Sequence, residues 1–448
     1  MKQYLLKLDA EKALAQTEEI VKTLTSLFQT DKVQRISNDQ IYLIELSAEN
    51  LLFQKLNESK KILTENIKEY LKSIAGTEKS KYLVGNIEHF EINPILYIEP
   101  IKITAERSSI DKLWGQRQIR FPEAKKILPR RPKPEMPIGI ATIDTGISFN
   151  HPALEDIIWK SPHKFSVQIE NQNFDFAEGS FGFNVFDLYD EDKRGHPSDS
   201  HYHGTIVAGI IGAKDIGITR IDEKYFPIQL LAIKAFASGS SHSTDPVTEG
   251  HRIIQALDFI VEARKALKKM RNPIDLRIVN MSFGYYRRDY PRFSDILEKH
   301  IKKTSEEGIL FVSGAGNNRK DLDVTINDKD WEFYPAGIDC DGMIAVAAIE
   351  RSGCLWIESN YGKENVHIAA PGDSIYSTAF NDYTFGSGTS LAAPFVTASA
   401  ALSLLAEPAL GNREIKTRLI ETADKIPPLG VQSDGSLDIY KFIYTYAK

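Results

Sequence analysis

The chain has 448 residues, enough for two or three domains, and 42% of them are apolar, so full hydrophobic cores are expected. A formal net charge of -6 gives no basic footprint for nucleic acid, and two cysteines, Cys340 and Cys354, do not make a disulfide framework. No stretch is apolar enough for a signal peptide or a membrane span, so a cytoplasmic protein is expected, although export without a signal peptide stays open.

Residues 1–100 have the pattern of a small α+β domain. Alternating apolar runs are separated by stretches with apolar residues at helical spacing, which predicts the order β-α-β-β-α-β. This order is the ferredoxin-like pattern, which serves many functions and assigns none by itself. The expected elements are strands at 3–8, 33–37 and 41–46, helices across Val21–Phe28 and Leu63–Ile74, and one or two strands within 81–100.

Residues 111–448, which follow a linker over 101–110, have a different pattern of apolar and polar residues. Short apolar runs rich in β-branched residues alternate with amphipathic stretches, and each run is followed by Gly, Ser or Asn. This is typical of buried parallel strands with functional loops at their carboxyl ends, so an α/β domain with a mostly parallel sheet is expected. The candidate strands are 138–143, 230–236, 276–284 and 308–316, and the candidate crossover helices are 249–270 and 294–307.

The first of these runs ends in Asp144-Thr145-Gly146, which has three interpretations. An aspartic protease would need a second such tripeptide or a short dimerising chain, and this chain provides neither. A serine protease can use the aspartate as the acid of a Ser-His-Asp triad. A strand that merely ends in Asp and turns on Gly is the third interpretation.

Two further motifs favour the serine protease. His203 opens the segment HGTIVAG, and Ser390 stands in GSGTSLAAP ahead of an apolar helical stretch. Other segments with matching order are WGQRQI at 114–119, NMSFG at 280–284, LFVSGAGNN at 310–318 and APGDSIYST at 370–378. Together these segments resemble the subtilisin-like (subtilase) family over about residues 110–425.

The resemblance implies a subtilisin-like three-layer α/β domain and a role for each motif. His203 is the base that takes the proton of Ser390, and Asp144 orients the imidazole. The side-chain amide of Asn317 and the backbone N–H of Ser390 hold the oxyanion. Neither metal nor cofactor is expected, and structural calcium is doubtful because Ala153 stands where many members carry an acidic ligand. The expected substrate-binding residues are Ser282, Phe283, Gly284, Gly314, Ala315, Gly316 and Phe333.

Each assignment has a competitor nearby. His201 lies two residues before His203, and Asn318 follows Asn317, but the family pattern favours His203 and Asn317. Asp199 fits a loop cap better than a catalytic acid. The remaining candidates lack the expected contexts and are interpreted as surface or structural residues: His151, His196, His367 and Ser387.

The segment DWEFYPA resembles the floor of the pocket that receives P1, the substrate residue before the scissile bond. If Phe333 occupies this floor, small P1 residues are expected. If Phe333 points into the core, Glu332 faces the pocket and basic P1 residues are expected, because neighbouring strand residues point to opposite faces.

The position and element order of residues 1–100 resemble the propeptide that folds and inhibits subtilases, with a permanent recognition or regulatory domain as the alternative. The insertion at about 155–200, between Asp144 and His203, either contacts substrate or a regulator or is a tolerated surface segment. The sequence therefore predicts a serine endopeptidase whose partners are a peptide or protein substrate, its own N-terminal domain and a regulatory protein, with no nucleic acid or membrane. The alternative is a catalytically silent subtilase-fold protein that binds peptides.

Overall fold

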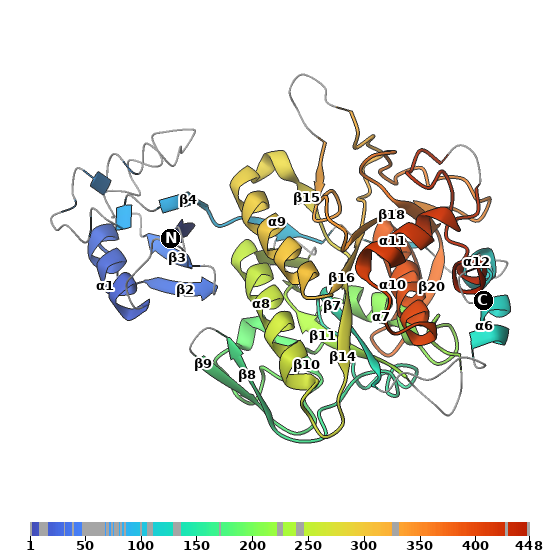
Figure 1. Cartoon of the computed structure of the whole chain (residues 1–448), viewed down its shortest axis with the longest axis horizontal. Helices are drawn as coiled ribbons and strands as arrows, with labels where there is room; N and C mark the ends of the chain where they lie inside the picture. Colours follow the sequence, from blue (N-terminus) through green and yellow to red (C-terminus); the bar gives the residue numbers. More distant parts are fainter. Residues whose placement is uncertain are drawn as a thin grey trace.

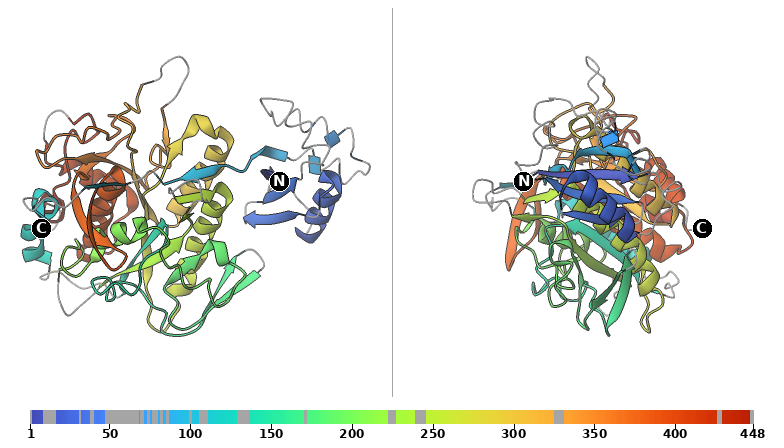
Figure 2. Two further views of the ribbon diagram at one scale, coloured as in Figure 1. Left: turned by 180° about the vertical axis from the view of Figure 1, so that it is seen from behind. Right: turned by 90° about the vertical axis from the view of Figure 1, so that its left-hand side faces the viewer.

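The protein consists of a small N-terminal unit and a larger domain, joined by an extended stretch of chain (Figure 1). The two parts lie side by side in the left view of Figure 2, and the right view looks along the line that joins them, with the N-terminal unit in front. The computed structural model describes residues 2–8, 17–30, 32–37, 40–46, 68, 71–72, 75, 80, 83–84, 87–98, 101–104, 111–128, 136–169, 172–221, 227–238, 246–324, 331–425 and 429–445.

The N-terminal unit contains a four-stranded antiparallel sheet in the order β2-β3-β1-β4, which is the ferredoxin-like order. Most of the predicted helix Leu63–Ile74 lies outside the described residues, although Leu71 is buried in the core of this unit. The bounds are β1 (Lys2–Leu8), α1 (Thr17–Phe28), β2 (Val33–Ser37), β3 (Ile41–Leu46) and β4 (Ile87–Ile92).

Both faces of this small sheet are buried. Tyr4 and Leu6 point toward α1 and join its core, whereas Leu5 points the other way and joins a core of the larger domain. The alternation follows from the two-residue period of a strand. The second face packs on helices α8 (Gly250–Leu267) and α9 (Pro291–Glu306) of the larger domain.

The larger domain is built on a seven-stranded parallel sheet in the order β10-β11-β7-β14-β16-β18-β19. Helices α7 (His203–Gly212) and α10 (Thr389–Ala406) cover one face, and α8 and α9 cover the other, so the α/β prediction is confirmed (Figure 1). The strand bounds are β10 (Gly182–Asn184), β11 (Ile228–Lys234), β7 (Ile138–Asp144), β14 (Asp275–Met281), β16 (Leu310–Gly314), β18 (Met343–Ile349) and β19 (Ile368–Pro371).

Helix α10 has the length and hydropathy of a membrane span, alone among the helices in the described part of the chain, yet it is wholly buried. It is the core helix of a layered domain, and its length and hydropathy correct the expectation that no stretch is apolar enough for a membrane span. The remaining elements are β5 (Ile95–Tyr97), β6 (Lys102–Thr104), α5 (Trp114–Gln118), α6 (Phe121–Ile127), β8 (Phe165–Ile169), β9 (Gln172–Phe176), β12 (Ala237–Ser238), β13 (Pro246–Glu249), β15 (Tyr285–Tyr286), β17 (Phe333–Tyr334), β20 (Ile375–Ala379), β21 (Asp382–Ser387), α11 (Asn412–Glu421) and α12 (Ile439–Tyr444).

Candidate active site

Asp144 and His203 form a buried pair at the carboxyl end of the sheet. Asp144 is the last residue of β7 and His203 the first of α7. The Nδ1 atom of His203 lies 2.8 Å from Oδ1 and 2.9 Å from Oδ2 of Asp144. Because a carboxylate only accepts, Nδ1 carries the proton and Nε2 is left as the acceptor of the neutral ring. Nε2 is enclosed and has no hydrogen-bond partner among the described residues.

Two glycines permit this close approach. A side chain at Gly204 would meet the carbonyl oxygen of Gly146 at 2.1 Å and the Asp144 carboxylate at 3.1 Å. Gly146 itself has φ of +101° and lies against the carbonyl oxygen of Pro197, where a Cβ would be 2.4 Å away. The turn after the aspartate and the helix that begins with the histidine therefore fit only without side chains at these positions.

Ser390 is the second residue of α10 and only 5% exposed. Its Oγ donates to the carbonyl oxygen of Ser282, 3.2 Å away, and its own carbonyl oxygen accepts from Oγ of Ser282 at 3.0 Å. That carbonyl is available because Pro394, four residues on, has no N–H to donate. Pro394 thus lies inside α10, and Ser282 satisfies the acceptor that it leaves.

A buried chain of polar groups supports Ser282. The Nδ2 atom of Asn280 donates to Oγ of Ser282 at 2.9 Å, and Oγ1 of Thr397 donates to Oδ1 of Asn280 at 2.8 Å. Sequence reasoning missed Asn280 and Thr397. The sequence does hint at them, because each is a polar residue between apolar residues of a buried segment, where an unpaired polar group would be costly.

Asn317 follows β16 and lies against the segment that precedes Ser390. Its Oδ1 accepts from the backbone N–H of Thr389 at 2.8 Å and from Oγ1 of Thr389 at 2.9 Å. Thr389, also missed from the sequence, therefore fixes the orientation of the amide, because it holds the oxygen and leaves the NH₂ group as the donor. The competitor Asn318 is used differently, because its Oδ1 accepts from the hydroxyl of Tyr286 at 2.7 Å.

Phe333 lies between two of the predicted substrate-binding segments. A Cβ built on Gly284 would be 2.2 Å from its ring, and one built on Gly316 would be 2.9 Å away. The ring is buried, whereas Glu332 forms an ion pair with Arg287 at 3.2 Å. The other predicted residues, Ser282, Phe283, Gly314 and Ala315, are buried at the ends of β14 and β16.

The remaining histidines have structural contacts. His151 accepts from the backbone N–H of Ala153 at 3.1 Å, and Nδ1 of His367 accepts from the N–H of Ala345 at 2.8 Å. Burial lowers the pKa of His367 to about 3, with a smaller contribution from Lys416. In the described part of the chain, no three His, Cys, Asp or Glu side chains gather in a way that could hold a metal ion.

Residues 95–104, here called the connector, contain two short strands that pair with strands of the larger domain. Strand β5 pairs antiparallel with β13, and β6 pairs antiparallel with β21. Between them Ile101 is buried, and its Cγ2 lies 2.4 Å from where a Cβ on Gly386 would stand. Strand β21 leads directly into α10, so β6 pairs with the strand that precedes the candidate nucleophile Ser390.

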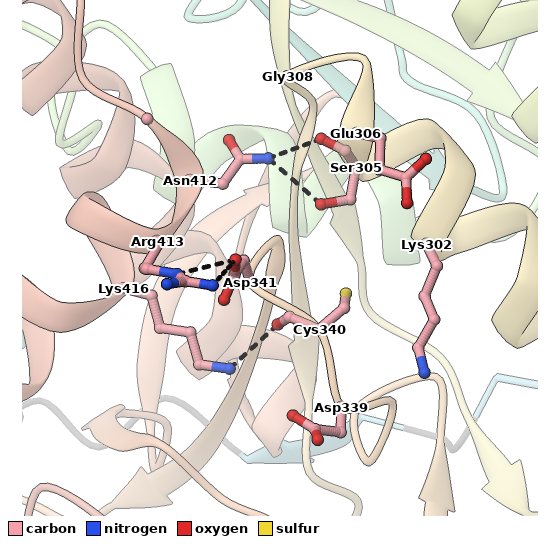
Figure 3. A pocket seen from close by; sticks show the side chains of 11 residues that line it. Lys302, Ser305, Glu306, Gly308, Asp339, Cys340, Asp341, Asn412, Arg413 and Lys416 are labelled. Carbon is pink, nitrogen blue, oxygen red and sulfur yellow. Dashed lines mark hydrogen bonds and ion pairs between the residues drawn. The ribbon is translucent and has the colours of Figure 1, made fainter.

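A cavity of about 680 Å³ lies elsewhere, between α9, α11 and the loop before β18 (Figure 3). Its lining includes Gly308 and Asp341, which precede β16 and β18, so the cavity is at the amino ends of the strands. Open α/β sheets bind ligands at the carboxyl ends, where Asp144, Ser282 and Asn317 lie. The cavity is therefore separate from the candidate active site.

The chain belongs to the subtilase family, because the family model described as "Subtilase family" matches residues 137–440. Subtilisin-like protease 1 of Plasmodium falciparum is 28% identical over 354 residues, covering 74% of this chain and 46% of the relative. The thermophilic serine proteinase of Bacillus sp. strain AK1 is 30% identical over 292 residues, covering 65% and 57%. The chain thus spans about half the length of the curated relatives it matches.

Two solved structures share the fold. The epidermin leader peptide processing serine protease of Staphylococcus aureus superposes with a TM-score of 0.66 at 18% identity, covering 100% of this chain and 99% of that chain. A cold adapted subtilisin-like serine proteinase gives a TM-score of 0.50 at 20% identity, covering 73% of this chain and 96% of the other. At these identities the likeness establishes the fold, and the first match includes the N-terminal unit.

Proposed function

We propose that the protein is a serine endopeptidase that uses Asp144, His203 and Ser390. The observation that carries the proposal is the Asp144–His203 pair, which holds the proton on Nδ1 and leaves Nε2 as an enclosed acceptor. A base in this state takes the proton of a serine hydroxyl when that hydroxyl turns toward it. Ser390 would leave its contact with Ser282 and rotate toward Nε2 as substrate binds.

In the proposed reaction, Oγ of Ser390 attacks the peptide carbonyl carbon while its proton passes to Nε2 of His203. The imidazolium then protonates the leaving amine, and an ester between Ser390 and the acyl part of the substrate remains. Water, activated by His203, hydrolyses the ester. Asp144 stabilises the imidazolium, and the N–H groups of Ser390 and of the Asn317 amide stabilise the oxyanion. The proposed reaction needs no cofactor.

The N-terminal unit is proposed to inhibit the enzyme in cis. The connector already occupies the strand-pairing edges β13 and β21, which an extended substrate would otherwise use. The insertion at about 155–200 supports this role, because the hydroxyl of Tyr189 accepts from Gln34 of β2 at 2.7 Å. The contact favours the hypothesis that the insertion holds a regulator, here the protein's own first unit.

A fluorophosphonate probe tests the activity, since labelling needs an activated serine. The purified chain is incubated alone, probed at intervals and analysed by mass spectrometry beside Ser390→Ala. Cleavage within residues 101–110 and rising label, both absent from Ser390→Ala, are the expected results. An intact chain that hydrolyses added peptides would instead make the first unit a recognition module. A chain with neither label nor hydrolysis, before and after removal of its N-terminal unit, would identify a silent peptide-binding family member.

A further inference from the structure

Asp199 binds donors from two separate segments that carry the candidate catalytic pair. Its Oδ1 accepts from Oγ1 of Thr145 at 2.8 Å and from the backbone N–H groups of His201 at 2.8 Å and Tyr202 at 3.0 Å. Its Oδ2 accepts from the backbone N–H of Thr205 at 3.0 Å and from the Thr205 hydroxyl. The carboxylate therefore collects five donors, and the prediction that Asp199 is a loop cap describes only part of its contacts.

The donors stand next to the two catalytic side chains in sequence. Thr145 directly follows Asp144, and its Oγ1 also accepts from the N–H of Gly204, 3.0 Å away. Tyr202 directly precedes His203. The Asp199 carboxylate thus links the residue that follows Asp144, at the end of β7, to residues before and after His203, at the start of α7.

Tyr202, the residue before His203, has a strained backbone that Asp199 helps to hold. Its φ is +78°, in the left-handed region that a residue with a Cβ rarely adopts because it is strained there. The strained residue is held by the hydrogen bond from its N–H to Asp199. Strain of this kind persists only where the surroundings over-determine it, and it is concentrated at functional sites.

We propose that Asp199 is a positioning residue that fixes the imidazole of His203 against Asp144. The inference rests on the proposed function, but it assigns Asp199 no contact with substrate. An asparagine at this position has one acceptor oxygen instead of two, and its NH₂ would face the N–H of Thr205 or Tyr202 as a donor against a donor. The first turn of α7 would then relax toward an unstrained φ at Tyr202, and His203 would rotate away from Asp144.

The test compares Asp199→Asn with Asp192→Asn, a matched exposed aspartate in the same insertion. Asp199→Asn is expected to lower kcat at least tenfold with KM within about twofold, while Asp192→Asn behaves as the parent chain. Active-site titration with fluorophosphonate gives the fraction of folded, competent enzyme, so kcat is expressed per titrated site. Adding Tyr202→Gly to Asp199→Asn should recover several-fold in kcat, because glycine adopts a positive φ without cost.

A measurement on the inert Ser390→Ala chain separates this proposal from the proposed function. In ¹⁵N-histidine NMR, the proton on Nδ1 of His203, shared with Asp144, is expected far downfield and should move upfield or broaden in Asp199→Asn. Unchanged kcat per titrated site together with an unchanged resonance would overturn the positioning role. A parent chain that is never labelled, yet shows the resonance and its loss, would refute the peptidase and retain the positioning.

Discussion

The two faces of the seven-stranded sheet differ in the size of the side chains that pack on them and in what they contact. The face with α7 and α10 is packed through small residues, and side chains at Gly204 or Gly314 would meet neighbours within 3 Å. The face with α8 and α9 carries large aromatic side chains and receives the N-terminal unit. The first face holds the candidate catalytic groups in one geometry, whereas the second presents a surface to a separate unit.

Two titratable side chains, His251 and Glu91, lie where the N-terminal unit packs on α8 and α9. The Nδ1 atom of His251, on α8, lies 2.9 Å from Nδ2 of Asn93 in the N-terminal unit, and an amide nitrogen can only donate. His251 is therefore held unprotonated at this atom, and burial, helped by Arg252, lowers its pKa to about 3. Glu91 of β4 faces α9 with an enclosed Oε1 that has no partner in the described part of the chain.

Burial raises the pKa of Glu91 to about 8, against the influence of Arg292 and together with that of Asp295. Between pH 4.5 and 6.5, His251 and Glu91 are thus both neutral when the unit is docked, and both become charged once water reaches them. The face that receives the N-terminal unit can therefore respond to pH through single side chains. The face with α7 and α10 depends instead on short distances between backbone segments.

The largest effect is expected from His203→Ala, which removes the base on the small-residue face. Peptide hydrolysis by the processed enzyme should fall by at least about 10⁴-fold, since triad members act as a unit. His201→Ala is the matched control and should retain most activity. Loss of hydrolysis in His201→Ala with retention in His203→Ala would reverse the assignment of the base.

Asn317→Ala should lower kcat by about 10²–10³-fold with little change in KM, because one oxyanion donor is lost. The magnitude comes from a member of this same family. Asn318→Ala, which removes only the partner of Tyr286, should cost far less. Equal losses in the two variants would mean that the effect is transmitted through loop structure and is not due to a direct donor.

Phe333→Ala is expected to change specificity by about tenfold. The ring between Gly284 and Gly316 would limit P1 to small residues, and its removal should raise kcat/KM for Leu or Phe at P1. Melting measurements must accompany the assay, since truncating a buried Phe costs about 3–5 kcal/mol. Strong cleavage after Phe, Tyr or Leu by the parent enzyme would contradict the occluded pocket.

The smallest effect concerns pH at the docking face. His251 has an ordinary pKa of 6.5, so docking should weaken as pH falls below 6.5, because release of the N-terminal unit lets His251 of the larger domain take up a proton that it does not accept while the unit is docked. Glu91 has an ordinary pKa of 4.5, so docking should weaken as pH rises from 4.5 through about 8. Docking is therefore expected to be strongest between pH 4.5 and 6.5.

Hydrogen exchange of β1–β3 amides in the full-length Ser390→Ala chain measures this docking. Protection should drop several-fold on either side of the window. In Glu91→Gln, the alkaline loss should vanish while the acidic loss remains. An alkaline loss that persists in Glu91→Gln would assign it to a different group.

The sequence predicted the parts of the molecule that are set by short-range chemistry. Asp144, His203 and Asn317 were predicted as site residues because each stands in a glycine-containing motif, at or shortly after the end of a buried strand or at the start of a helix. The strand order of the N-terminal unit followed from its alternating pattern. The family resemblance, and not periodicity alone, supplied the roles.

Other features depend on contacts between distant residues and leave no local pattern. Asn93 meets His251 only because two units dock, and Asp199 meets Thr145 across 54 positions of sequence. The strand pairing of residues 102–104 was also missed, since this segment was expected to be a linker. A three-residue strand formed on an existing edge has too little periodicity to be recognised.

The placement of β5 and β6 on one chain has a kinetic consequence. While the connector is intact, it rebinds the strand edges in a unimolecular step whose rate does not depend on protein concentration, because its ends are tethered beside them. The proposed cut within residues 101–110 would turn the binding of β5 and the N-terminal unit to the larger domain into a bimolecular equilibrium. Simple dilution would then release activity, whereas concentrated enzyme would remain restrained by the fragment that it had produced.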